Sequence, residues 1–188
     1  SLSVIDISNP AAPVVVGTIK DAVGANQLDG ATAITVVGKY AYVASFFDDS
    51  LSIIDISNPA SPSEVGTAKD GVSGFTQLDG ADAVTVVGKY AYVTSNNDNA
   101  LSIINIATPA SPSEVGTIKD GTGATQLGAA WGVAVAGKYA YVTSNFDNAL
   151  SVIDISTPAS PTEAATIVDG AGANQLSGAW GVVVSGKY

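Results

Sequence analysis

Four positions at which otherwise near-identical segments differ are the first candidates for chemistry. Each lies eight residues before a tyrosine of a repeated Gly-Lys-Tyr tripeptide, and they are Thr32, Asp82, Trp131 and Trp180. If the fold required one residue type at this position, all four segments would carry it. The fold alone therefore does not explain why these side chains differ. Aromatic rings supply stacking area and carboxylates supply directed acceptors, as in sites that recognise carbohydrate or peptide. The alternative is that both tryptophans pack inside the fold, since large aromatic side chains are mostly buried.

Phenylalanines extend this candidate ligand-binding surface. They occur in loop segments and are not repeated in every copy: Phe46, Phe47, Phe75 and Phe146. Exposed aromatic side chains beside carboxylates favour a protein or a glycan as the partner.

Short turns rich in Asp and Asn suggest calcium as a candidate cofactor. The acidic residues concerned are Asp48, Asp49, Asp98 and Asp147. Calcium prefers oxygen ligands but takes six to eight of them, and each turn supplies only two or three. A site would need help from another loop, from water or from a neighbouring repeat. The other interpretation is that Asp and Asn tolerate the left-handed backbone of a tight turn, and the sequence leaves both open.

The chain has few residues of the types that usually catalyse reactions. The chain has no His, no Cys and no Arg, which removes the usual nucleophilic triads and metal hydrolases. The remaining option is a carboxylate pair such as Asp79 with Asp82, acting as acid and base on a glycoside. We expect no enzymatic activity, and a carboxylate-based glycan hydrolase is the alternative.

The net charge argues against a nucleic-acid partner, and the apolar pattern argues against a membrane-spanning helix. A formal net charge of -10 disfavours binding to the phosphate backbone of a nucleic acid. Gly, Ser, Asp or Pro interrupts every apolar run before it reaches the roughly 18 residues that a membrane-spanning helix needs. The sequence therefore predicts no nucleic-acid partner and no transmembrane segment.

An internal repeat organises the whole chain. The tyrosines that close the Gly-Lys-Tyr tripeptides are spaced by 50, 49 and 49 residues: Tyr40, Tyr90, Tyr139 and Tyr188. A period near 50 with several short strands per unit is typical of propeller blades. We expect an all-β β-propeller of four-stranded antiparallel blades, with about four repeats of roughly 49 residues.

The second repeat shows the expected elements. A β-branched run, residues 83–87, leads through a Gly-Lys turn into residues 90–95, which predicts a hairpin of strands A and B. A turn rich in Asn precedes strand C at 101–106, and two prolines separate it from strand D at 114–118. Strand A is almost wholly apolar, as an inner strand must be, whereas Pro, Glu and Lys mark strand D as the outer edge.

This strand order predicts two faces. The D–A loops and B–C turns emerge on one face, which we call the top. All seven of the following aspartates fall there, so we expect it to be the more acidic face: Asp29, Asp48, Asp49, Asp79, Asp82, Asp98 and Asp147. The A–B turns, with Lys39, Lys89, Lys138 and Lys187, emerge on the bottom, where we also expect Glu64, Glu114 and Glu163. At the end of strand C an Asx side chain is expected to accept hydrogen bonds from the following turn, at Asp6, Asp55, Asn105 and Asp154.

The blade boundaries follow from this assignment within a single propeller segment, residues 1–188. Residues 31–78, 81–127 and 130–176 are expected to form complete blades. Residues 1–20 should supply strands C and D of a split blade, and residues 179–188 should supply its strand A. Because open blade faces would expose Val, Ile and Tyr, we expect the rest of the same polypeptide or a second copy to close the ring.

Two motifs carry a family resemblance over essentially the whole chain. Residues 51–62 (LSIIDISNPASP) and 138–142 (KYAYV) resemble the LVIVD repeat of bacterial and archaeal propellers, and the Tyr-Val-Thr-Ser segments resemble the YVTN repeats of archaeal surface-layer proteins. The resemblance implies a β-propeller of the cell surface, extracellular space or cell envelope, without a common activity. We expect a non-catalytic binding or structural module of a cell-surface or secreted protein, which recognises its partner through the top face.

Overall fold

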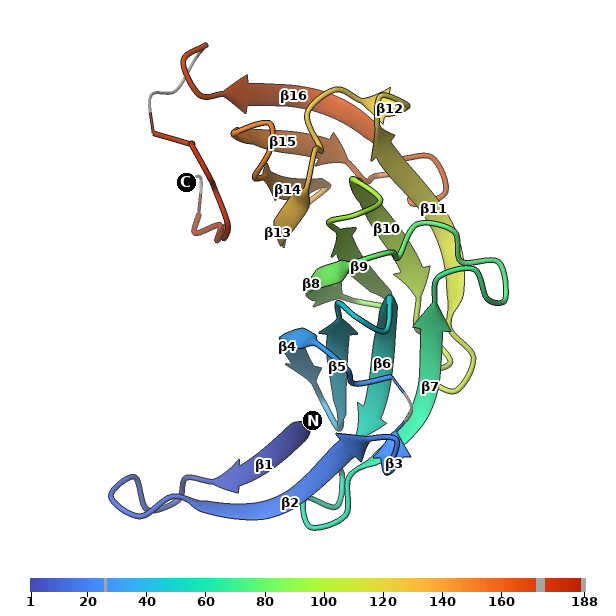
Figure 1. Cartoon of the computed structure of the whole chain (residues 1–188), viewed down its shortest axis with the longest axis vertical. Coiled ribbons are helices and arrows are strands. Elements are labelled where there is room, and N and C mark those ends of the chain that lie inside the picture. Colours follow the sequence, from blue (N-terminus) through green and yellow to red (C-terminus); the bar gives the residue numbers. More distant parts are fainter. Residues whose placement is uncertain (26, 172–174, 187–188) are drawn as a thin grey trace.

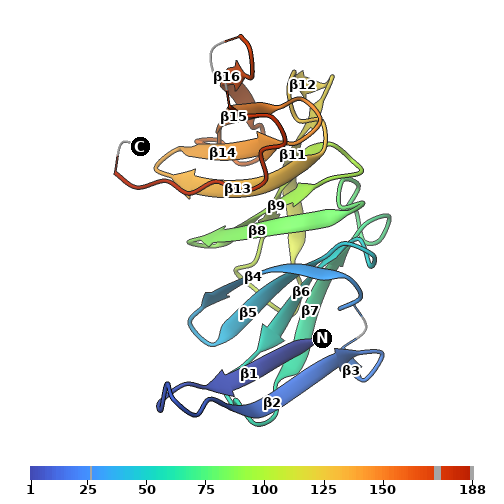
Figure 2. The same ribbon diagram turned by 60° about the vertical axis from the view of Figure 1, so that its left-hand side comes forward.

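The computed structural model describes residues 1–25, 27–171 and 175–186, and all of its regular elements are β-strands. Four sheets follow one another around an open arc (Figure 1). Seen after a 60° turn, the sheets are stacked face to face like the blades of a propeller (Figure 2). The fold is therefore all-β and propeller-like, as the repeat period predicts. No helix that could cross a membrane occurs within the described residues.

The first complete sheet has the expected order from the inner to the outer side of the arc. It runs β4 (Ala31–Val37), β5 (Tyr40–Ser45), β6 (Ser50–Asp55) and β7 (Ser63–Lys69), and its neighbouring strands are antiparallel. Figure 1 shows β4, β8 and β13 on the concave side and β7, β11 and β16 on the convex side. Strand A is thus innermost and strand D outermost.

The next two sheets repeat this order. One consists of β8 (Ala81–Val87), β9 (Tyr90–Ser95), β10 (Ala100–Asn105) and β11 (Ser113–Asp120), with the short β12 (Gly123–Ala124) added in parallel to β11. The other consists of β13 (Ala130–Ala136), β14 (Tyr139–Ser144), β15 (Ala149–Asp154) and β16 (Thr162–Val168). The three sheets fall within the ranges expected for complete blades.

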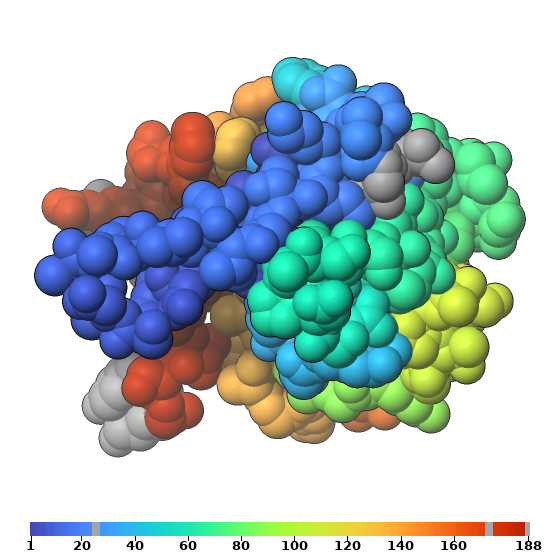
Figure 3. Space-filling view, turned by 90° about the horizontal axis from the view of Figure 1, so that it is seen from below, coloured from blue at the N-terminus to red at the C-terminus, as the bar shows by residue number. Residues whose placement is uncertain are grey.

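The split blade is represented at both ends of the arc. At the first end β1 (Leu2–Asp6) pairs with β2 (Val14–Asp21), to which the short β3 (Gly24–Ala25) adds. Figure 3 shows this N-terminal pair beside the first blade. At the other end no strand is assigned within residues 175–186, where strand A was expected. The expected strand spans residues 179–188, of which residues 187–188 lie outside the described part.

The hydrophobic core lies between adjacent sheets. Leu51 and Ile53 of β6 point to the second blade, where they pack with Val84 and Val93, whereas the next residue, Ile54, joins a cluster with β1 and β2. A third cluster joins the second and third blades around Leu101 and other buried residues. Because successive side chains of a strand point to opposite faces, the central strands of the first two blades (β5, β6, β9 and β10) are buried on both sides. The innermost strand β4 of the first blade is largely exposed.

Local hydrogen bonds confirm the turn assignments on the bottom face. The carboxylate of Asp55 accepts from the backbone N of Ser57 at 2.8 Å and pairs with Lys39 at 3.2 Å. Equivalent bonds to the residue two positions on occur at Asp6, Asn105 and Asp154. Hydrogen bonds from Ser156 and the ion pair with Lys138 lower the pKa of Asp154 to about 2.

Two of the glutamates expected on the bottom accept hydrogen bonds from hydroxyl groups of their own blade or of the loop before it, and a position near the turn lysines stays a prediction. Glu64 accepts a hydrogen bond from the Ser52 hydroxyl within its own sheet, at 2.8 Å. Glu163 accepts from Thr125, in the loop that precedes its blade. A register shift between β6 and β7 precedes Ile54, the residue that pairs with Glu64, and such a bulge redirects side chains.

Candidate functional site

A β-bulge presents the variable position in each inner strand. In the first blade Ala31 pairs with Ser45 and Ala33 pairs with Ala44, so that Thr32 is the extra residue. The same register shift leaves Asp82 as the extra residue of β8, and a third shift lies between Ala130 and Val133 of β13. Bulges are frequent beside functional sites because they change the direction of one side chain without ending the strand.

The four variable residues come together along one hollow on the concave side of the arc. Its volume is about 510 Å³, within the range that small-ligand sites occupy. It is lined by Thr32, Ala33, Asp82, Ala83, Trp131, Gly132, Val133, Trp180, Gly181 and Val182. Residues separated by about 49 positions thus meet because β4, β8, β13 and the segment around Trp180 follow one another around one axis. We call this feature the channel hollow.

The two tryptophans form a stacked pair in the channel hollow. Their ring centroids are 4.2 Å apart with an angle of 30° between the planes. Trp131 is partly buried, whereas 63% of Trp180 is exposed. The hydroxyl of Thr94 donates to the carbonyl of Trp131 at 2.6 Å, and that of Thr143 donates to the carbonyl of Trp180 at 3.0 Å. Each tryptophan backbone is therefore held by the preceding blade, while aromatic surface stays accessible.

Asp82 is the one ionisable residue among the described residues that line the channel hollow. It is only 6% exposed, and its Oδ2 atom is buried without a hydrogen-bond partner in the described structure. Burial raises the pKa of Asp82 to about 6, because loss of solvation disfavours the charged form. A buried carboxylate without a partner is unfavourable for the fold, and the other three copies do not carry one at this position.

Thr32 has a structural role that the sequence analysis missed. Its hydroxyl donates to the carbonyl of Asp82 in the next blade at 2.7 Å. The first blade has Ala44 where the later blades have Thr94 and Thr143, so it lacks the hydroxyl that makes the corresponding inter-blade bond there. Comparing positions 32 and 44 with their equivalents in the later repeats could have revealed this role. The hydroxyl belongs to strand B in the later blades, at Thr94 and Thr143, and to strand A in the first blade, at Thr32.

The phenylalanines divide into exposed and buried residues. Phe47 and Phe146 are 70% and 77% exposed, and Phe46 is partly buried and meets Phe47 edge to face at 5.4 Å. Phe75 is only 2% exposed and packs in the core between the first two blades. Its assignment to the ligand-binding surface is therefore wrong, because its loop folds inward and its ring fills the space between two sheets. None of the four lines the channel hollow.

A family model of the LVIVD repeat matches four segments of the chain, residues 1–21, 30–70, 80–120 and 127–169. The chain belongs to the LVIVD repeat family. The four matched LVIVD segments coincide with the four sheets, and the expected family resemblance is confirmed for this repeat. No curated protein matches the sequence.

Solved structures support the fold of these LVIVD repeats. A putative 6-phosphogluconolactonase from Bacteroides uniformis is 18% identical, with a TM-score of 0.66 over 90% of this chain and 48% of its own. A functionally unknown protein from Desulfotomaculum acetoxidans is 17% identical, with a TM-score of 0.64 over 90% of this chain and 51% of its own. The designed protein Ika4 is 13% identical, with a TM-score of 0.59 over 84% of this chain and 81% of its own. The chain thus spans about half the length of the two natural proteins, and the likeness concerns the fold alone.

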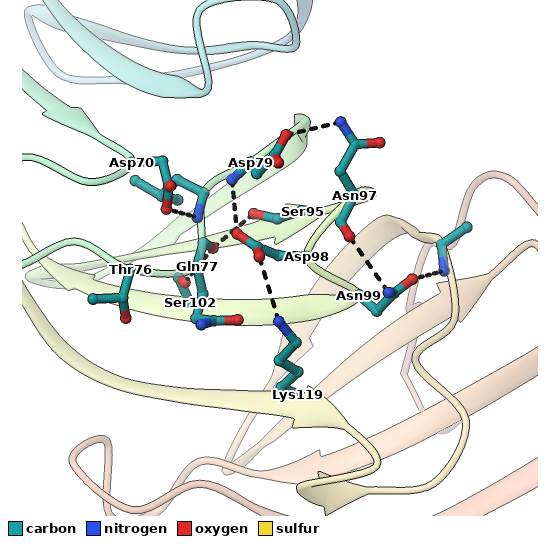
Figure 4. Close-up of polar contacts among 12 residues, drawn as sticks. Asp70, Thr76, Gln77, Asp79, Ser95, Asn97, Asp98, Asn99, Ser102 and Lys119 are labelled. Atoms are coloured by element: carbon teal, nitrogen blue, oxygen red, sulfur yellow. Dashed lines mark hydrogen bonds and ion pairs between the residues drawn. The ribbon is translucent and has the colours of Figure 1, made fainter.

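The acidic turns join the LVIVD blades to one another on the top face, as Figure 4 shows for the second blade. Asp98 accepts from the backbone N of Asp79 at 2.9 Å and lies 3.4 Å from the Lys119 ammonium. The next residue, Asn99, has a left-handed φ of 56° and accepts from the backbone N of Ala129 at 2.7 Å. Asp48 and Asp147, like Asp98, accept a hydrogen bond from the backbone of the loop that precedes their own blade. Asp49, like Asn99, accepts one from the backbone of the loop that leads into the next blade.

This arrangement gives the proposed calcium residues a structural role. The left-handed backbone at Asp49, Asn99 and Asn148 is the feature that the turn interpretation expects. Within the described residues, no three acidic side chains come together as a group that could hold a metal. Calcium binding stays a prediction, which the melting temperature in chelator and in millimolar calcium tests.

The structure gives the proposed catalytic pair different environments. Asp79 lies on the exposed top face, where its carboxylate accepts from the Asn97 side chain at 2.8 Å. Asp82 lines the channel hollow, which Asp79 does not. Burial is the only cause that raises the pKa of Asp82, with no contribution from the charge of Asp79.

Proposed function

We propose that this chain is a non-catalytic binding module and that the channel hollow is its recognition site. The observation that carries the proposal is the convergence of the variable positions. Near-identical repeats differ at Thr32, Asp82, Trp131 and Trp180, and these four residues line one hollow of about 510 Å³. Stacked indole rings, one carboxylate and small neighbouring residues combine apolar contact area with a directed polar group, which is the composition of a ligand site.

The top face contributes a second, outer contact region. Phe47 and Phe146 are exposed in B–C turns next to acidic side chains. A protein or glycan that reaches the channel hollow from the top would pass these turns. We further propose an extracellular or cell-envelope location, which the likeness to surface-layer repeats supports and which cell fractionation with an antibody tests.

An array of peptides and glycans tests the proposed site. Ligands found with the wild-type chain are measured again with a Trp131→Ala/Trp180→Ala double variant, and we expect a loss of affinity of at least tenfold. Phe146→Ala removes an exposed aromatic ring of the outer contact region instead, outside the channel hollow, and we expect a smaller loss of affinity than in the double variant. Circular dichroism verifies that each variant is folded. Equal affinity of the wild type and the double variant for all ligands would contradict the proposal.

A carboxylate-based glycan hydrolase is the second candidate, and one observation favours it. A carboxyl group with a pKa near 6 can act as a general acid at neutral pH, and Asp82 has this property. A glycosidase also needs a second carboxylate at a suitable distance, and the described residues that line the channel hollow do not include one. Release of reducing sugar from a bound glycan, abolished in Asp82→Asn, would establish the hydrolase and overturn the non-catalytic proposal.

A further inference from the structure

The side chain of Asp82 lacks a cationic partner although it is almost fully removed from solvent. Within the described residues its carboxyl group makes no hydrogen bond and no ion pair, and its Oδ2 atom is buried. The equivalent positions hold Thr32, Trp131 and Trp180, so the fold does not require an acid in this place. A buried, unpaired carboxylate costs stability, and a ligand that supplies the missing partner would recover that free energy.

The surroundings of Asp82 match an organic cation. The Trp131–Trp180 pair lies in the same hollow, and the face of an indole is the best aromatic partner for a cation. In the described part of the chain no lysine lines the hollow, so none competes for the carboxylate there. The net charge of -10 attracts cations toward the molecule and repels anions. A neutral saccharide would use the rings but would gain less from the carboxylate.

We propose that the channel hollow receives the ammonium or guanidinium end of a lysine or arginine side chain presented by a peptide. Asp82 pairs with the charged end, and the tryptophan pair contacts the cation and the aliphatic stem. This inference rests on the proposed function, since it specifies the ligand class of the same hollow. The volume of about 510 Å³ accommodates one such side chain with its neighbouring backbone.

A pair of short peptides tests this inference. The probe is a Gly-Gly-Lys-Gly-Gly peptide blocked at both ends, and its control carries acetyl-lysine, which is similar in shape but neutral. Binding is followed by calorimetry and by tryptophan fluorescence, because the chain has only two tryptophans and both line the hollow. We expect saturable binding of the probe at pH 7.5 and at least tenfold weaker binding of the acetylated peptide.

Two substitutions and a change of pH show whether the Asp82 carboxylate itself, or only the overall negative charge of the chain, binds the probe. We expect Asp82→Asn to weaken probe binding at least tenfold. Asp79→Asn removes the same charge outside the hollow and should change the affinity less than twofold. Among the described residues Asp82 is the one titratable group that lines the hollow, with no ionisable neighbour perturbing it. Lowering the pH from 7.5 to 5 should therefore weaken binding about tenfold, as protons compete for a group with a pKa near 6.

The outcomes distinguish the inference from the proposed function. Equal binding of both peptides, or unchanged binding by Asp82→Asn, overturns the cation inference. Absence of probe binding, while cellohexaose or another array ligand binds in a tryptophan-dependent manner, overturns the inference and leaves the recognition site standing. Probe binding that survives the double tryptophan substitution overturns both.

Discussion

The side chain of Asp82 is buried in the folded chain, and its Oδ2 atom has no hydrogen-bond partner within the described residues. The residue is only 6% exposed, and burial raises the pKa of its carboxyl group to about 6 from an ordinary value near 3.8. A group whose pKa is raised by folding stabilises the folded state while it is protonated in that state. This contribution is present at low pH and is lost as the pH rises through 6.

The substitution Asp82→Asn should therefore stabilise the chain at pH 7.5 and have little effect near pH 4. The gain at pH 7.5 is up to about 3 kcal/mol in the free energy of unfolding, from a shift of about two pKa units. Urea unfolding of wild type and variant at both pH values, at one protein concentration, measures it. A variant that is less stable than the wild type at pH 7.5 would contradict the environment described for Asp82.

At the scale of elements, the repeats are joined by the residue that follows each turn aspartate. Asp49, Asn99 and Asn148 have φ values between 53° and 56°, and each accepts a hydrogen bond from the backbone of the next blade's D–A loop. The bond needs an acceptor oxygen on a side chain that tolerates the left-handed region. Asp and Asn satisfy both conditions, which explains why the repeats use either.

Three substitutions at Asn99 test this inter-blade bond. Asn99→Ala should lower the free energy of unfolding by about 1–3 kcal/mol, because it loses the bond to Ala129 and leaves an alanine at positive φ. Asn99→Gly keeps the backbone relaxed and isolates the loss of the bond, and Asn99→Asp should retain stability as Asp49 does in the first blade. Chemical denaturation orders the three variants, and an alanine variant as stable as the wild type would refute the role.

The elements were more predictable from the sequence than the contacts between them. Strand order, turn positions and the Asx turns at Asp55 and its equivalents follow from periodicity and local turn chemistry. The burial of Phe75 and the placement of Glu64 depend on loop paths and bulges that join distant residues, and a single repeat carries no signal for them. The channel hollow is an intermediate case, because the repeat alignment places its four residues together but does not disclose that Asp82 is unpaired.

At the scale of the whole molecule, both ends of the arc are incomplete blade faces. Ile34 and Val36 are 50% and 54% exposed, whereas Val84, which is equivalent to Ile34, is 5% exposed because the preceding blade covers it. The outer strands also meet closely: a Cβ atom on Gly66 or Gly116 would overlap a carbonyl of the next blade's C–D loop. The third blade has Ala165 at this position, paired with Val152 as Gly116 is with Ile103. If a further blade docked there in the same geometry, the methyl group of Ala165 would meet the equivalent carbonyl, and the backbone would have to shift.

The isolated chain should therefore self-associate through its exposed end faces, and less tightly than blades pack within the chain. Ile34→Glu should weaken the association, and Ala165→Gly should strengthen a head-to-tail contact by removing the obstructing methyl group. Ala164→Gly is the control for glycine flexibility alone. Light scattering over a range of concentrations measures all four chains. A wild type that stays monomeric throughout would contradict the prediction.

We propose that this LVIVD chain binds its partner in the channel hollow, around Thr32, Asp82, Trp131 and Trp180. The most direct test is tryptophan fluorescence of the unmodified chain, titrated with any ligand whose affinity calorimetry has established. Both tryptophans line the hollow and stack at 4.2 Å, so we expect an occupant to change their emission. We predict a saturable change in emission whose dissociation constant equals the calorimetric one. Binding without any change in emission would contradict the proposed site.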